Sequence, residues 1–151
     1  MNDPGVRVSC RGCSASFSRK TTEILFTSDR TGSPQIYRMD GYGLEQQRIR
    51  LRGGYNDAAS FSPDNKKIVY QSRARHNAFD IFVYDVDRGE SVRIVNPRGS
   101  NENPAWSPDG RFVVFASNRS GKFQLYLVKA TGGEPRQLTT RGNNETPCFC
   151  P

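Results

Sequence analysis

The residues of this chain that could carry chemistry are four cysteines and one histidine. The cysteines form two pairs, Cys10-x-x-Cys13 and Cys148-x-Cys150, and closely spaced thiolates are common ligands of structural zinc. The second spacing is too short for a standard zinc knuckle, and its cysteines occupy positions that hold serine or alanine in other copies of a sequence repeat. His76 is alone and cannot supply a two-histidine site. We therefore expect no metal and no cofactor.

Signatures of common enzymes are also missing. The sequence contains no Gly-x-Ser-x-Gly nucleophile elbow, no phosphate-binding glycine loop and no His-Glu-x-x-His motif. Residues 85–89 (DVDRG) resemble the start of a calcium loop but lack the rest of an EF-hand, so a hairpin turn explains them better. We predict a non-enzymatic protein without catalytic residues.

The charge and hydropathy of the chain exclude two further classes. Its formal net charge is +7 at pH 7, but the basic residues are scattered and are not interleaved with aromatics as in single-strand binders, so we expect no nucleic acid partner. The longest apolar run, residues 112–116, is far shorter than the roughly 20 residues that span a bilayer. We expect no membrane insertion, and the first twenty residues lack the apolar stretch of a signal peptide.

A repeat dominates the sequence. Residues 56–72 (NDAASFSPDNKKIVYQS) and 101–117 (NENPAWSPDGRFVVFAS) match over seventeen positions without a gap. A degraded copy begins at Cys13 and a further copy begins at Asn143. The aromatic residue of each copy recurs at spacings of 44, 45 and 43 residues, at Phe17, Phe61, Trp106 and Phe149. A period of this length indicates a repeat architecture.

Each period contains four short strand-like segments separated by turns. Ser-Pro-Asp-Asn or Ser-Pro-Asp-Gly ends the first segment, where Pro restricts φ and Asn or Gly tolerates a positive φ. The second segment is continuously apolar, which is typical of a strand buried on both faces. The predicted second, third and fourth strands are 23–27, 35–39 and 47–51, then 67–71, 80–84 and 92–95, then 111–116, 124–128 and 136–139.

Four antiparallel strands per 40–45 residues form one blade of a β-propeller. We predict an all-β fold with three full β-propeller blades plus one leading strand. Residues 1–12 form an unassigned tail, the blades span about 13–55, 56–100 and 101–142, and residues 143–151 start the next blade. Such a segment leaves two blade faces open, so either the chain is part of a longer propeller or a homodimer closes the ring.

The repeats resemble those of the TolB family of β-propellers, which have WD40-like repeats. Because propellers of this family have six blades, the resemblance implies that this segment is part of a six-bladed propeller. The resemblance rests on residues 24–40 (ILFTSDRTGSPQIYRMD), on the two SPD-containing copies, on residues 117–128 (SNRSGKFQLYLV) and on residues 132–147 (GGEPRQLTTRGNNETP). It departs from the family at Arg19-Lys20, which replace Pro-Asp, and at residues 73–77, which replace a DRTG-type turn with a basic one.

This resemblance implies a function and a location. The family works in the periplasm as part of the Tol–Pal system, although this chain shows no signal peptide. Its members bind the peptidoglycan-associated lipoprotein Pal and other Tol proteins, which implies roles in outer-membrane integrity, cell division and protein import. Related repeats also occur in prolyl oligopeptidase-type serine peptidases, where the propeller gates substrate access, and this is the alternative interpretation.

The loop that enters each first strand carries an asparagine followed by an acidic residue. In a propeller these loops lie on one face around the central channel. Either they satisfy local backbone groups, or they bind a partner. The resemblance favours binding, because the family's Pal-binding face is built from these loops; in the first copy, Cys13 holds the acidic position. The candidate partner-binding residues are Tyr55, Asn56, Asp57, Ser100, Asn101, Glu102, Asn144 and Glu145.

Overall fold

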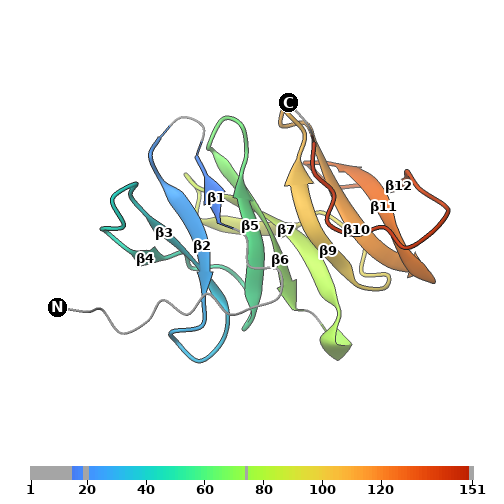
Figure 1. Cartoon of the computed structure of the whole chain (residues 1–151), viewed down its shortest axis with the longest axis horizontal. Helices are drawn as coiled ribbons and strands as arrows, with labels where there is room; N and C mark the ends of the chain where they lie inside the picture. The colour runs from blue at the N-terminus through green and yellow to red at the C-terminus, as the bar shows by residue number, and fades with distance from the viewer. Residues whose placement is uncertain (1–14, 19–20, 74, 150–151) are drawn as a thin grey trace.

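The computed structural model of the chain describes residues 15–18, 21–73 and 75–149. These residues form three four-stranded antiparallel sheets and one short 3-10 turn, η1 (Arg75–Asn77). Figure 1 shows the three sheets side by side in sequence order. The predicted all-β propeller fold is therefore confirmed, while residues 1–12 lie outside the described part of the chain.

Each sheet takes its strands in sequence order, as a propeller blade does. The first blade consists of β1 (Ser16–Phe17), β2 (Ile24–Ser28), β3 (Gln35–Met39) and β4 (Gln47–Arg48). The second consists of β5 (Asn56–Phe61), β6 (Lys67–Arg73), β7 (Phe79–Asp85) and β8 (Glu90–Arg93). The third consists of β9 (Asn101–Trp106), β10 (Phe112–Ser120), β11 (Lys122–Lys129) and β12 (Arg136–Gln137).

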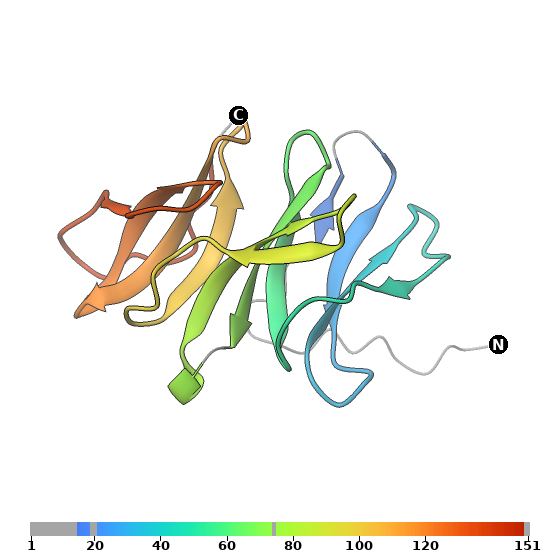
Figure 2. The ribbon, with the colours of Figure 1, turned by 180° about the vertical axis from the view of Figure 1, so that it is seen from behind.

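The first strands lie at the centre of the segment and the fourth strands lie at its outside. β1 contacts β5, and β5 contacts β9. In Figure 1 β5 and β9 are in front, whereas β8 faces the viewer when the molecule is seen from behind (Figure 2). Residues 143–149 form no strand, because the ladder of a first strand requires a second strand beside it.

Two of the fourth strands are shorter than predicted, and the other one is displaced along the chain. β4 and β12 have two residues each, and β8 begins and ends two residues earlier than expected. The chain beyond β4 keeps one bond to the third strand, from the Ile49 N–H to the Ile36 carbonyl (2.9 Å), and then turns the Ile49 side chain into the core. The ladder stops early because the inward-turning chain no longer runs beside the third strand.

The second strands are buried on both faces, as their continuous apolarity predicted. Alternate side chains of β6 point to opposite neighbours, because successive residues of a strand face opposite sides. Ile68 and Tyr70 join the core against the first blade, and Val69 joins the core against the third. The second blade is thus held between two apolar layers.

The Ser-Pro-Asp turns have the predicted backbone conformation and hydrogen bonds. Ser62 Oγ donates to Asp64 Oδ1 (2.6 Å), and the Asn65 N–H donates to the Ser62 carbonyl (2.9 Å). The Gly110 N–H makes the same turn bond to the Ser107 carbonyl. Asn65 and Gly110 adopt φ values of 62° and 70°, the left-handed conformation that these two residue types tolerate.

Candidate partner-binding face

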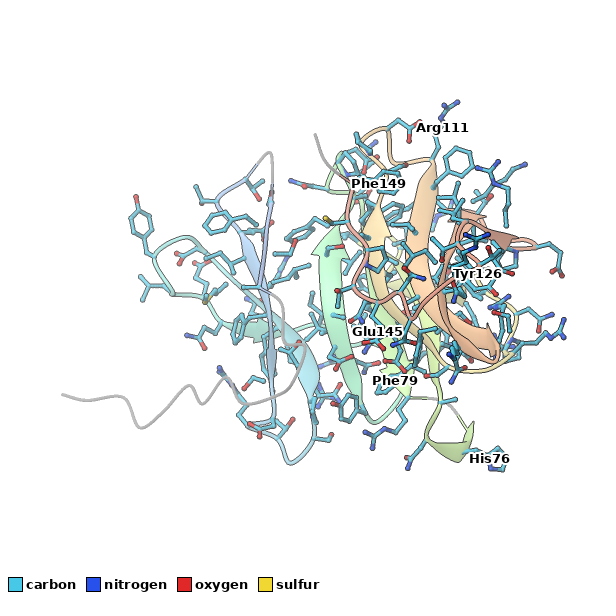
Figure 3. The ribbon with its side chains drawn as sticks, turned by 45° about the vertical axis from the view of Figure 1, so that its right-hand side comes forward. His76, Phe79, Arg111, Tyr126, Glu145 and Phe149 are labelled. Atoms are coloured by element: carbon cyan, nitrogen blue, oxygen red, sulfur yellow. The ribbon has the colours of Figure 1, made fainter. Side chains whose placement is uncertain are left out.

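The predicted binding residues gather at one end of the blades. We call this end the asparagine face and define it by residues 52–57, 72–73, 75–80, 96–102 and 141–145. Figure 3 shows His76, Phe79 and Glu145 toward this end, and Arg111 and Phe149 toward the other. The Ser-Pro-Asp turns lie at the opposite end, because first strands run from the asparagine face to those turns.

The three asparagines join neighbouring blades. Asn56 and Asn101 are fully buried, and Asn144 is half-buried. Each side-chain amide donates to a polar residue within the first three positions of the third strand of the preceding blade. The bonds are Asn56 Nδ2 to Gln35 Oε1 (2.9 Å), Asn101 Nδ2 to Asp80 Oδ1 (3.3 Å) and Asn144 Nδ2 to Gln124 Oε1 (3.0 Å).

Asn56 and Asn101 therefore have a structural contact, and neither is accessible to a partner. The acceptors of the three asparagines, Gln35, Asp80 and Gln124, were not singled out from the sequence, although a polar residue at the equivalent position of every repeat was the available signal. The candidate residues that remain exposed or half-buried are Tyr55, Ser100, Glu102, Asn144 and Glu145.

The blade contact at Asn101 can be tested by its removal. Asn101→Ala removes the donor to Asp80 and the acceptor of Arg119 Nη2 (2.7 Å), so two groups lose a buried partner. We expect the free energy of unfolding to fall by about 1–3 kcal/mol. Urea unfolding followed by the fluorescence of Trp106 measures it, with Asn96→Ala, which changes an exposed residue, as the control. A loss equal to that of the control would contradict the structural contact.

Asp57 is a buried carboxylate. Only 3% of the residue is exposed, and no described residue is hydrogen-bonded to its Oδ1. Burial raises the pKa of Asp57 to about 6, hydrogen bonds from Gln71 and Tyr55 oppose the rise, and the negative charge of Glu102 adds to it. At neutral pH the folded chain therefore carries a destabilising charge beside a second acidic residue.

The pKa of Asp57 determines how stability should change with pH. Because the pKa is higher in the folded state than in the unfolded state, the folded state binds more protons between about pH 4 and pH 6, and stability falls as pH rises through this window. Asp57→Asn should remove this fall and raise the free energy of unfolding at pH 7 by up to about 3 kcal/mol. Urea unfolding of both proteins from pH 4 to pH 7 tests this; parallel profiles would contradict it.

The residue after each acidic position has an unfavourable backbone conformation. Ala58, Asn103 and Thr146 have φ values of 49°, 53° and 51°, a region costly for residues with a Cβ and most of all for β-branched Thr. The register of β5 against β6 shifts between Asp57 and Ser60, as at a β-bulge. The strain recurs in three copies although the residue type differs, so sequence patterns could not reveal it.

The asparagine face also carries a cavity between the second and third blades. Its volume is about 820 Å³. Asp80, Arg93, His76 and Ser100 contribute to its lining. Arg93 Nη1 lies 3.3 Å from Asp80 Oδ2, with the Arg93 side chain 47% exposed and Asp80 buried.

Within residues 15–18, 21–73 and 75–149, no group of three or more His, Cys, Asp or Glu side chains could hold a metal ion. Cys148 is exposed and unpaired, and Cys10, Cys13 and Cys150 lie outside the described residues. No helix in the described part of the chain has the length and apolarity to cross a bilayer.

A protein-family model matches nearly the whole chain. This model, PD40, is described as the TolB beta propeller domain, and it matches residues 8–79 and 72–151. The chain belongs to this family. The resemblance inferred from the repeats is thereby confirmed, and the PD40 match covers all three blades.

Two TolB proteins are similar to this chain. The Tol-Pal system protein TolB of Helicobacter hepaticus is 30% identical over 121 residues, which cover 75% of this chain and 28% of the relative. The crystal structure of TolB from Acinetobacter baumannii is 28% identical with a TM-score of 0.81, covering 95% of this chain and 36% of that one. The chain spans less than a third of the curated relative.

A peptidase is also among the relatives. The uncharacterized peptidase YuxL of Bacillus subtilis is 34% identical over 85 residues, covering 52% of this chain and 13% of the relative. A puromycin-hydrolyzing peptidase from Mycobacterium tuberculosis has a TM-score of 0.64 at 18% identity, covering 89% of this chain and 21% of that one. The second likeness shows the fold alone.

Proposed function

We propose that this chain is a protein-binding part of a TolB-like propeller, and that its asparagine face docks the lipoprotein Pal in the periplasmic Tol–Pal system. Three features support the proposal: the PD40 family, the similarity to TolB proteins and the acidic residues at one end of the blades, each followed by a residue with a strained backbone. Through this contact the chain takes part in outer-membrane integrity, cell division and protein import.

The single observation that carries the proposal is the buried charge of Asp57. A carboxylate with 3% exposure and a pKa of about 6 destabilises the fold at neutral pH. Such groups are concentrated at functional sites, where binding compensates for the loss of stability. A cationic group of a partner placed near Glu102 would reduce the repulsion between Glu102 and Asp57.

Charge reversal at Glu102 tests the docking face. Glu102 is half-buried and accepts a hydrogen bond from Ser100 Oγ (2.6 Å), whereas Asp57 is too buried to accept a lysine without loss of the fold. We expect Glu102→Lys to weaken Pal binding by at least roughly tenfold, about 1.4 kcal/mol. Asp87→Lys, at an exposed turn of the opposite end, is the matched control.

The readout is calorimetric titration with purified Pal, after circular dichroism has shown that both variants keep their β-sheet spectrum. Equal affinity of Glu102→Lys and the unchanged chain would remove this face from the docking surface.

The second candidate function is a propeller that gates access to a serine peptidase. The similarity to YuxL favours it. The neighbouring coding sequence distinguishes the two: a downstream hydrolase domain with a nucleophile elbow supports the peptidase, and an upstream α/β domain behind a signal peptide supports the TolB function.

The outer blade faces need a cover in either case. Phe17 on β1 of the first blade is 67% exposed, and Leu138, next to β12 of the third blade, is 45% exposed. Further blades of a longer propeller or a second copy of the chain would cover them. Light scattering separates the two covers, because a homodimer of the 17.0 kDa chain has a mass of about 34 kDa.

A further inference from the structure

An arginine of the second blade lies on two aromatic rings at the asparagine face. The rings of Tyr55 and Phe79 meet edge to face with centroids 5.5 Å apart. The guanidinium carbon of Arg73 lies 4.1 Å from the centroid of Tyr55 and 5.6 Å from that of Phe79. Arg73 is exposed, so this group, which we call the Arg73 platform, is open to a partner.

The other blades contain stacked arginines whose donors are already used. Arg30 lies over Phe26 and Tyr37 and donates to Ser28 Oγ (3.0 Å) and Gln46 Oε1 (2.8 Å). Arg119 likewise stacks on two rings and donates to Ser117 Oγ and Asn101 Oδ1.

Arg73 differs: among the described residues, none accepts a hydrogen bond from its guanidinium and none forms a salt bridge with it, although its positive charge acts on the nearby Asp57 and lowers the pKa of that carboxyl. Stacking occupies the face of the guanidinium and leaves its N–H edge free. That edge matches the two oxygens of a carboxylate.

The position of this arginine is specific to the second blade. Arg73 follows Ser72, and the corresponding residues of the other copies are Asp29 and Asn118. The equivalent polar residue of the third strand follows Ser72 by eight positions, at Asp80, whereas it follows Ser28 and Ser117 by seven. In this longer connection His76 adopts a φ of 57°, so the backbone of a non-glycine residue is strained beside the platform.

The platform adjoins the 820 Å³ cavity. Phe79 pairs with Arg73 across β6 and β7, and its N–H donates to Ser100 Oγ (3.0 Å), which belongs to the cavity wall. Farther along this wall, the half-exposed Arg93 supplies a second guanidinium. A chain segment bound at the platform could therefore continue between two cationic groups.

We propose that the Arg73 platform binds a carboxylate side chain of an acidic peptide segment of the partner, and that the adjoining cavity receives the rest of that segment. This inference rests on the proposed function, since it requires a protein partner at the asparagine face. A singly charged carboxylate fits better than a phosphate group, because Asp57 lies beside Tyr55 with Glu102 near it, and these negative charges repel a dianion more strongly.

The test uses the full chain labelled with ¹⁵N and two blocked peptides, acetyl-Gly-Glu-Gly-amide and acetyl-Gly-Gln-Gly-amide, with inorganic phosphate as a third probe. We expect the Glu peptide to shift the Arg73 Nε–H and Phe79 amide signals saturably. Arg73→Lys, which keeps the charge but loses the planar fork, should weaken this binding by about fivefold, and Arg73→Ala should abolish it. Arg88→Ala, at the opposite end, should have no effect.

Equal shifts with the Gln peptide, tighter binding of phosphate, or unchanged binding to Arg73→Ala would each overturn the inference. The signals of Val113 and Phe115 in the third blade show whether each variant is folded. The outcome is separate from that of the Pal titration: a Glu peptide that binds through Arg73 while Glu102→Lys leaves Pal affinity unchanged would retain the platform and reject Pal as its partner at this face.

Discussion

The structure depends on one constraint, the burial of each second strand between two neighbouring blades. A sheet that is apolar on both faces cannot stand alone in water, so every blade requires a neighbour on each side. Burial of the apolar layers on either side of β6 stabilises the packing of the blades, but the hydrophobic effect does not fix their relative orientation. The hydrogen bond from an asparagine to the third strand of the preceding blade adds direction, because a buried amide must meet its partner at a specific geometry.

This contact also positions the candidate binding face. Each buried asparagine begins a first strand, and the acidic residue follows it directly, so the carboxylates are placed by the same bond that aligns the blades. The left-handed residue after each acidic position interrupts the ladder at this point. At Asp57 this produces a carboxylate that is deprived of water and raised in pKa. The charge of Asp57 therefore lowers the stability of the fold, while the proposed docking depends on that charge.

The second blade has the same four strands as the other blades but differs from them at two positions. Near the start of its third strand, Asp80 stands where the other two blades have glutamine. Its carboxylate forms a salt bridge with Arg93 and accepts a hydrogen bond from Asn101. At the end of its second strand Arg73 stacks on Tyr55 while its donors stay free. The fold shared by the three blades requires neither Arg73 nor the longer connection that follows it. These two features are therefore better explained by binding of a partner than by folding.

The sequence by itself determined the repeat, the four strands per blade and the turns that separate them. Its period gives the blade count, and the φ of Asn65 and Gly110 follows from residue type because these constraints are local. The third strand at residues 35–39 was predicted with its observed bounds for the same reason. Only the tertiary structure decided that Asn101 is buried against Asp80, that Asp57 is desolvated and that Arg73 has free donors. Each of these depends on which residues of a neighbouring strand or blade come within a few ångströms, and local residue patterns carry no such distance.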